Sequence, residues 1–240
     1  MQWTIDADLT TLGQFMLADS DARVAARWET RAIAGCCVGA AVLYSLWLLG
    51  PWINPDLDAL NGYVSEFAAR DQPGSRLFRI GDGLAGLLAA AAAVAGIRSS
   101  RGGVVGWSGL LVFGVATGLD GALTPMTCAS YVDSGCAVRE LVGALPATHT
   151  VHEMTSSVAA LGMLVAMGGL ARAGIGPQAR WGWAWCSATG LATVATLGAL
   201  WMGTGAGVTQ RAQLGLIATW LIALAVDHTR RTRSAGGFDA

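Results

Sequence analysis

The sequence predicts an all-α protein, a polytopic transmembrane helical bundle of about six spans with short helical segments in its outer loops. Six apolar stretches are each long enough to cross a bilayer, which takes about 20 residues. The chain is 53% hydrophobic and only 13% charged, about half the charge of an ordinary soluble domain. Its mean hydropathy is +0.50. The net charge of −1 indicates no nucleic-acid partner.

The apolar stretches divide the chain into three parts: a cytoplasmic N-terminal segment (1–30), a transmembrane domain (31–228) and a cytoplasmic tail (229–240). The N-terminal segment has no uninterrupted apolar core, so we interpret it as an amphipathic surface helix rather than a cleaved signal. Gly114 and Gly118 in the third span have the spacing that lets helix backbones approach closely. The predicted spans are 31–53, 80–98, 103–124, 149–172, 181–202 and 210–228.

Arginine placement predicts the orientation. All fifteen basic residues are Arg, and an even number of spans puts both termini on one side. Ten of the Arg fall on that side and five on the other, so the positive-inside rule makes both termini cytoplasmic. Three of the five Arg on the outer side share one loop, which weakens the difference in positive charge between the two sides.

Two outer loops, 54–79 and 125–148, are longer than minimal helix connections, and long loops in compact proteins tend to be functional. The first has apolar residues at helical spacing and predicts a short amphipathic helix over the mouth of the bundle. The second contains Cys128 and Cys136. On an oxidising face these would form a disulfide. A metal site is the alternative, although no CxxC pair completes it.

Costly polar residues gather at the outer ends of the predicted helices. Ionisable side chains in a membrane are expensive and are functional candidates by default. Asp120 follows the apolar run WSGLLVFGVATGL, so its carboxyl needs a partner or a proton. The expected partners are Arg211, His149 and His152. The candidates for catalysis are Asp120, Asp82, Glu66, His149 and His152, and those for substrate binding are Arg211, Gln210, Ser156 and Arg79.

These residues allow more than one interpretation. His149, His152 and Asp120 could hold a zinc ion with water in an open position, although an H-x-x-H pair alone is a weak signal. Alternatively, the cluster is an interhelical ion-pair network that fixes packing. Glu66 could act as a general acid or base, whereas the neighbouring Ser65 is explained equally well as a helix cap.

Several runs resemble the bacterial family called domain of unknown function 998, a group of multi-pass membrane proteins. The resemblance covers roughly 31–228 and implies a membrane architecture in a bacterial inner (plasma) membrane without implying an activity. The matching runs are NPDLDALNGYVSEFAARDQPGSRLFRIGDGLAG, LDGALTPMTCASYVDSGC, HTVHEMTS and GVTQRAQ, and the family-like positions are Ser65, Glu66, Pro125, Cys128, Cys136, His149, His152, Gln210 and Arg211.

Three classes of function are compatible with these observations. The favoured one is a membrane enzyme that acts on a lipid or isoprenoid, by metal-assisted hydrolysis or by proton-initiated chemistry such as terpene cyclisation. The second is a non-catalytic membrane subunit, sensor or lipid-binding protein. A transporter is less favoured, because the cytoplasmic half of the predicted bundle is apolar and the sequence shows no internal repeat. The expected partners are membrane lipids, and a homo-oligomer or a membrane protein partner is also compatible.

Overall fold

The structure is a computed structural model that describes residues 24–25, 27–99, 103–175 and 178–235. Most of the predicted N-terminal segment, 1–23 and residue 26, lies outside the described residues, as does the end of the tail, 236–240. The described part of the chain is helical and contains no strand.

Within the described ranges, six helices are long and apolar enough to cross a membrane, which confirms the predicted multi-pass architecture. The first span, Arg27–Ile53, ends in a 3₁₀ stretch, η1 (Leu46–Leu49), and a short helix, α2 (Gly50–Ile53). Pro51 explains this change, because it has no N–H to offer the carbonyl of Trp47, and the amide of Gly50 bonds that carbonyl instead. The other spans lie in α3 (Ser75–Ser99), α4 (Val104–Leu123), α6 (Ala147–Arg172), α7 (Gln178–Met202) and α8 (Ala206–Ala235).

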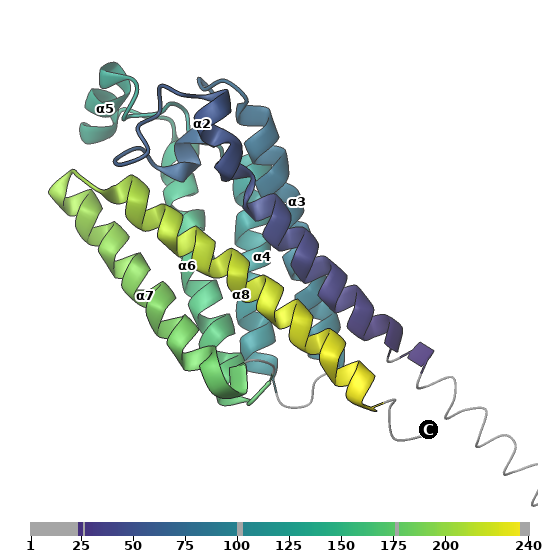
Figure 1. Cartoon of the computed structure of the whole chain (residues 1–240). Helices are drawn as coiled ribbons and strands as arrows, with labels where there is room; N and C mark the ends of the chain where they lie inside the picture. Colours follow the sequence, from purple (N-terminus) through teal and green to yellow (C-terminus); the bar gives the residue numbers. More distant parts are fainter. Residues whose placement is uncertain (1–23, 26, 100–102, 176–177, 236–240) are drawn as a thin grey trace, which may run out of the picture.

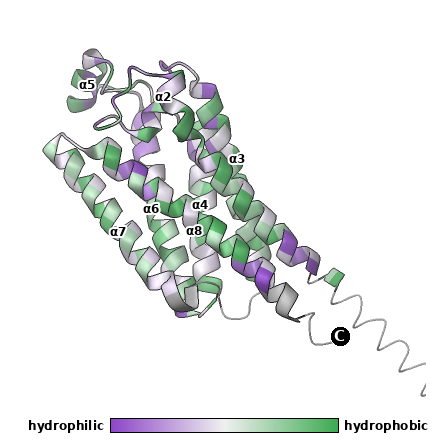
Figure 2. Cartoon of the chain, viewed as in Figure 1, coloured by the Kyte–Doolittle hydropathy of each residue, from purple (hydrophilic) through white to green (hydrophobic). Residues whose placement is uncertain are grey.

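The spans form an up-and-down bundle whose connections gather at two ends (Figure 1). One end, here called the loop end, has the two long loops together with α2, the 3₁₀ helix η2 (Val64–Ala68) and α5 (Ser134–Leu141). The start of the first span and the end of α8 lie at the opposite end, as an even number of spans requires. Hydropathy changes along the bundle, since apolar residues dominate the middle of the helices and polar residues are frequent at both ends (Figure 2).

Small residues bring α3 and α4 together. A Cβ built on Gly86 would lie 2.3 Å from the backbone nitrogen of Gly118, and one on Gly114 would lie 2.5 Å from that of Ala90. Neither distance is compatible with a side chain, so these backbones touch directly. Gly114 and Gly118, whose spacing is apparent in the sequence, therefore lie in the contact surface between α3 and α4.

The first outer loop differs from the expected amphipathic helix. Its ordered turn is the five-residue η2, and Leu60 is 53% exposed, although Leu57, Val64 and Phe67 are buried. Asp58 explains the difference, because its carboxylate accepts from the Leu60 amide and from the Asn61 side chain. The hydrogen bond from the Leu60 amide is the main cause of the lowered pKa of Asp58. Such local side-chain bonds compete with helix formation.

We expect Gly86→Ala to destabilise the bundle by about 1–3 kcal/mol, the usual cost of overpacking. Gly83→Ala is the matched control, because it lies on the same helix and no atom would be within 4 Å of its added Cβ. Thermal unfolding in detergent compares the two variants. Equal melting temperatures would contradict the direct contact between α3 and α4.

Candidate functional site

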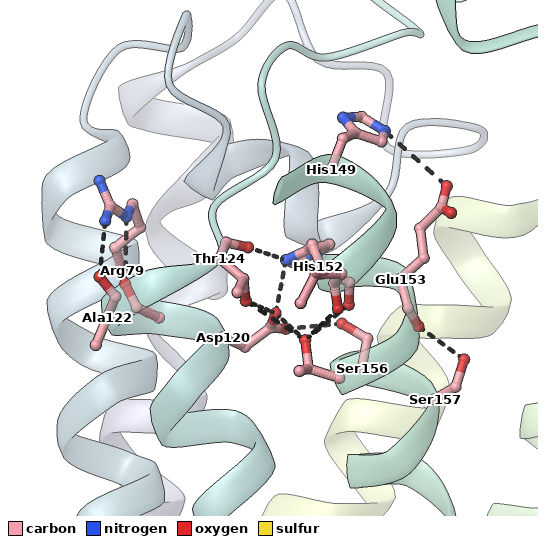
Figure 3. A network of polar contacts seen from close by, with 12 residues as sticks. Arg79, Asp120, Ala122, Thr124, His149, His152, Glu153, Ser156 and Ser157 are labelled. Atoms are coloured by element: carbon pink, nitrogen blue, oxygen red, sulfur yellow. Dashed lines mark hydrogen bonds and ion pairs between the residues drawn. The ribbon is translucent and has the colours of Figure 1, made fainter. Parts of the chain in front are cut away.

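The carboxylate of Asp120, near the end of α4, is held by side chains from two helices (Figure 3). Its Oδ1 accepts from Thr124 Oγ1 at 2.9 Å and from Thr155 Oγ1. Its Oδ2 accepts from Ser156 Oγ at 2.8 Å. The predicted partner Arg211 is not among these donors. Hydroxyl groups of α4 and α6 therefore fix the orientation of this carboxylate.

His152 is the fourth partner of Asp120. Its Nδ1 lies 2.9 Å from Asp120 Oδ1 and 3.1 Å from the carbonyl oxygen of Thr124. Both neighbours are acceptors, so Nδ1 carries a proton and, in the neutral ring, Nε2 has a free lone pair. His152 is 7% exposed, and its Nε2 has no hydrogen-bond partner within the part of the chain that is described. An Asp–His pair with one free nitrogen is the arrangement of a general base.

A partly open cavity of about 110 Å³ lies beside this pair. It is lined by the pair itself, by Ser65 and by Asp82, whose side chain makes no hydrogen bond or ion pair to the described residues. The indole nitrogen of Trp47, which also lines the cavity, is buried without a partner among the described residues, whereas Asp82 is half-buried. Buried polar groups are nearly always hydrogen-bonded, so these groups are placed to bind a ligand or water. The other lining residues are Tyr44, Leu46, Val64, Phe78, Thr117, Ser156, Ala159, Ala160, Gln210, Gln213, Leu214 and Ile217.

A groove of about 520 Å³ adjoins the cavity. Residues of α6, α7, α8 and both outer loops line it, and His152 belongs to the lining of groove and cavity alike. Its apolar part includes Leu161, Leu197 and Leu200, which are 62%, 61% and 40% exposed on spanning helices. The residues shared by groove and cavity are Ser65, His152, Ser156, Ala160, Gln210 and Gln213.

Glu66 has a structural environment. It is fully buried, and its carboxylate accepts from the Tyr63 amide at 3.0 Å, the Tyr131 amide at 3.0 Å and the Ser130 hydroxyl at 3.3 Å. Burial raises the pKa of Glu66 and outweighs these hydrogen bonds, which lower it. The residue connects the first outer loop to the second and does not line the cavity.

Three predicted substrate-binding residues are also engaged with the backbone. Arg79 donates to the carbonyls of Gly121 and Ala122 at the end of α4, both at 3.2 Å. Gln210 accepts from the Val64 amide at 2.7 Å, and Arg211 donates to the carbonyls of Ala59 and Gly62. Gln210 still lines both cavity and groove, whereas Arg79 and Arg211 line neither.

The predicted metal set is not assembled. His149 faces away from Asp120 and toward Glu153, as Figure 3 shows, and its Nε2 lies 4.0 Å from that carboxylate. His152 instead bonds Asp120 through Nδ1. Residues three apart on a helix differ by about 60° around the axis. The two rings therefore face different carboxylates, Glu153 and Asp120. The ligand atoms of Asp120, His149 and His152 therefore do not converge on one ion.

The predicted disulfide is present. Cys128 and Cys136 are bonded, with their Cα atoms 6.0 Å apart, and the bond ties the start of α5 to the loop that follows α4. Asp133 caps α5 by accepting from the Gly135 amide at 2.8 Å. The second outer loop thus has two local constraints on its shape.

Residues 37–227 match the family model described as Protein of unknown function (DUF998). The chain belongs to this family. The match confirms the resemblance found in the sequence and includes the whole candidate site. Comparisons with curated proteins and with solved structures find no match. The DUF998 description assigns no activity.

Sequence reasoning missed Thr124, Thr155 and Glu140. The two threonines follow usable signals, because Thr124 lies one turn after Asp120 and Thr155 lies one turn after His152. Glu140 had no such signal, since its place depends on where the second outer loop forms the short helix α5.

We expect Glu66→Ala to lower the free energy of unfolding by about 1–3 kcal/mol, because the amides of Tyr63 and Tyr131 would lose their acceptor. Thermal unfolding in detergent measures the change. Asp56→Ala, an exposed acid in the same loop, is the control and should be neutral. A neutral Glu66→Ala would contradict the connecting role.

The effect of Glu66 should depend on pH. A carboxyl whose pKa is raised on folding contributes stability below its ordinary pKa, 4.5, and loses it as the pH rises through the raised value. The stability advantage of the wild type over Glu66→Ala should therefore shrink as the pH rises from 4.5 toward neutrality. Unfolding scans across that range measure the difference, and an advantage that grows with pH would contradict this.

Proposed function

We propose that this protein is an integral membrane enzyme that acts on a lipid or isoprenoid substrate, with the Asp120–His152 pair as its general acid and base. The observation that carries this proposal is the free Nε2 of His152, which belongs to a ring that lines both the cavity and the groove. Asp120 holds Nδ1 and stabilises the imidazolium that forms when Nε2 takes a proton.

The groove supports a lipidic substrate. Its exposed leucines lie on membrane-spanning helices, so an acyl or isoprenoid chain can enter from the bilayer without crossing water. The cavity of about 110 Å³ has room for only a few water-sized groups. It would therefore hold the reacting bond and a water molecule, while the tail stays in the groove.

Hydrolysis is the reaction class that this geometry favours. In this scheme Nε2 of His152 takes a proton from a bound water as the oxygen attacks the substrate, and it later returns the proton to the leaving group. Ser65 and Gln210 line the same space and supply hydrogen-bonding groups that orient the substrate.

A specific observation favours proton-initiated chemistry as the second candidate. Asp82 has no side-chain partner among the described residues and shares the cavity with Tyr44, Trp47 and Phe78. A protonated carboxyl beside aromatic rings could protonate an alkene, and the rings would stabilise the resulting cation.

The proposed setting is a bacterial inner membrane with both termini in the cytoplasm. Ten of the fifteen arginines lie on the side of the termini. The Cys128–Cys136 disulfide at the loop end supports the same orientation, because disulfides persist on the oxidising side of a membrane. The candidate site would then lie near the outer surface.

The first test identifies lipids that co-purify with the protein in detergent and assays turnover of the bound species. We expect Asp120→Asn and His152→Gln each to lower turnover about 10²- to 10⁴-fold, because each removes the activated base. Asp82→Asn should retain turnover under the hydrolytic scheme. Asp56→Asn, an exposed substitution in the first outer loop, is the control and should keep full activity.

These variants distinguish hydrolysis, proton-initiated chemistry and a non-catalytic role. Loss in Asp82→Asn with retention in His152→Gln would replace hydrolysis by proton-initiated chemistry. Unchanged turnover in both Asp120→Asn and His152→Gln would contradict the proposal that the protein is an enzyme with this acid–base pair. If the variants only unfolded more readily and no lipid were converted, the non-catalytic reading would replace it.

A further inference from the structure

A second group of polar side chains lies at the rim of the groove, apart from the Asp120–His152 pair. It consists of Glu140 on α5 and of His149 and Glu153 on α6. Their ligand atoms all lie within 4.8 Å of one another. Nε2 of His149 is 3.9 Å from Glu140 Oε1 and 4.0 Å from Glu153 Oε1.

The His149 ring needs a partner that the described residues do not supply. Its side chain is only 2% exposed, and Nε2 has no hydrogen-bond partner in the described ranges. The two carboxylate oxygens are too far away for a hydrogen bond, which requires about 3.2 Å or less. A buried nitrogen that faces two carboxylates across such gaps is suited to a cation placed between them.

We propose that Glu140, His149 and Glu153 bind a divalent metal ion of the zinc class. One imidazole and two carboxylates are ligands that zinc accepts, and imidazole disfavours magnesium and calcium. Three protein ligands leave an open position, as in catalytic zinc sites. Ligand atoms in a tetrahedral zinc site lie about 3.4 Å apart, so a small inward rotation of Glu140 and Glu153 completes it. Their side chains, 31% and 54% exposed, have room to rotate.

Binding has a consequence for the neighbouring loop. Nδ1 of His149 accepts the Thr127 amide at 3.3 Å. Coordination through Nε2 of a neutral ring places the proton on Nδ1, so this long hydrogen bond opens when the ion binds. Thr127 precedes Cys128, whose disulfide to Cys136 anchors the helix that carries Glu140. The site and the disulfide therefore share one loop.

The ion would lie beside the groove without belonging to the acid–base pair. Glu140 and Glu153 line the groove together with His152, whereas Asp120 does not. The open coordination position is thus available to a water molecule or to an anionic oxygen that enters the groove. This site can be occupied whether or not the proposed hydrolysis takes place.

The test is zinc binding by the full chain, purified in detergent with its disulfide intact and with an affinity tag that contains no histidine. The protein is stripped with a chelator and titrated with zinc chloride by calorimetry, and bound metal is counted by mass spectrometry after desalting. We expect one zinc ion per chain. His149→Gln should weaken binding at least as much as loss of a supporting residue does, about 10- to 100-fold.

Two further variants keep the test decisive if His149→Gln fails to fold. The double variant Glu140→Gln/Glu153→Gln changes partly exposed residues and should also lose stoichiometric zinc. His152→Gln should retain it, because His152 bonds Asp120 instead. Zinc should raise the melting temperature of the wild type but not of the double variant. Absence of stoichiometric zinc, equal affinity in the double variant, or loss in His152→Gln alone would overturn the proposal.

Discussion

The partly buried carboxylate of Asp120 is the constraint on which the loop end of the bundle depends. A charge in a membrane protein must be matched by internal donors, and Asp120 receives four from α4 and α6. That requirement fixes the distance between these helices at their loop ends and the orientation of His152. Closer to the middle of the bundle, the same two helices are held by Gly109 and Gly162, where an added Cβ would meet backbone atoms.

Polar groups also determine how the outer loops cover the bundle. Glu66 connects the two loops, while Gln210 and Arg211 attach the first loop to α8. These residues look like site residues in the sequence because they are ionisable or polar and lie near the membrane. Their hydrogen bonds to backbone groups also stabilise the walls of the cavity. In the cavity, His152 has a buried Nε2 without a partner in the described part of the chain, and Asp82 lies in the lining beside it.

The six spans could be predicted from the sequence because a bilayer imposes a length and a composition on each helix. The Cys128–Cys136 disulfide also followed from local pattern. The pairing of side chains did not, because the direction of each ring depends on rotation around a helix and on loops whose path is not periodic. His149 and His152 illustrate this, since neighbours in one motif reach Glu153 and Asp120 respectively.

The attachment of the first outer loop to α8 has a consequence for biosynthesis. The amide of Val64 finds its acceptor on Gln210, 146 residues later, and the carbonyl of Gly62 finds its donor on Arg211, 149 residues later. Chains are made from the N-terminus, and early segments fold before later ones exist. The first outer loop therefore lacks these hydrogen-bond partners until the sixth span has entered the membrane. A chain interrupted before α8 would contain Asp120 and His152 yet lack one wall of the groove beside them.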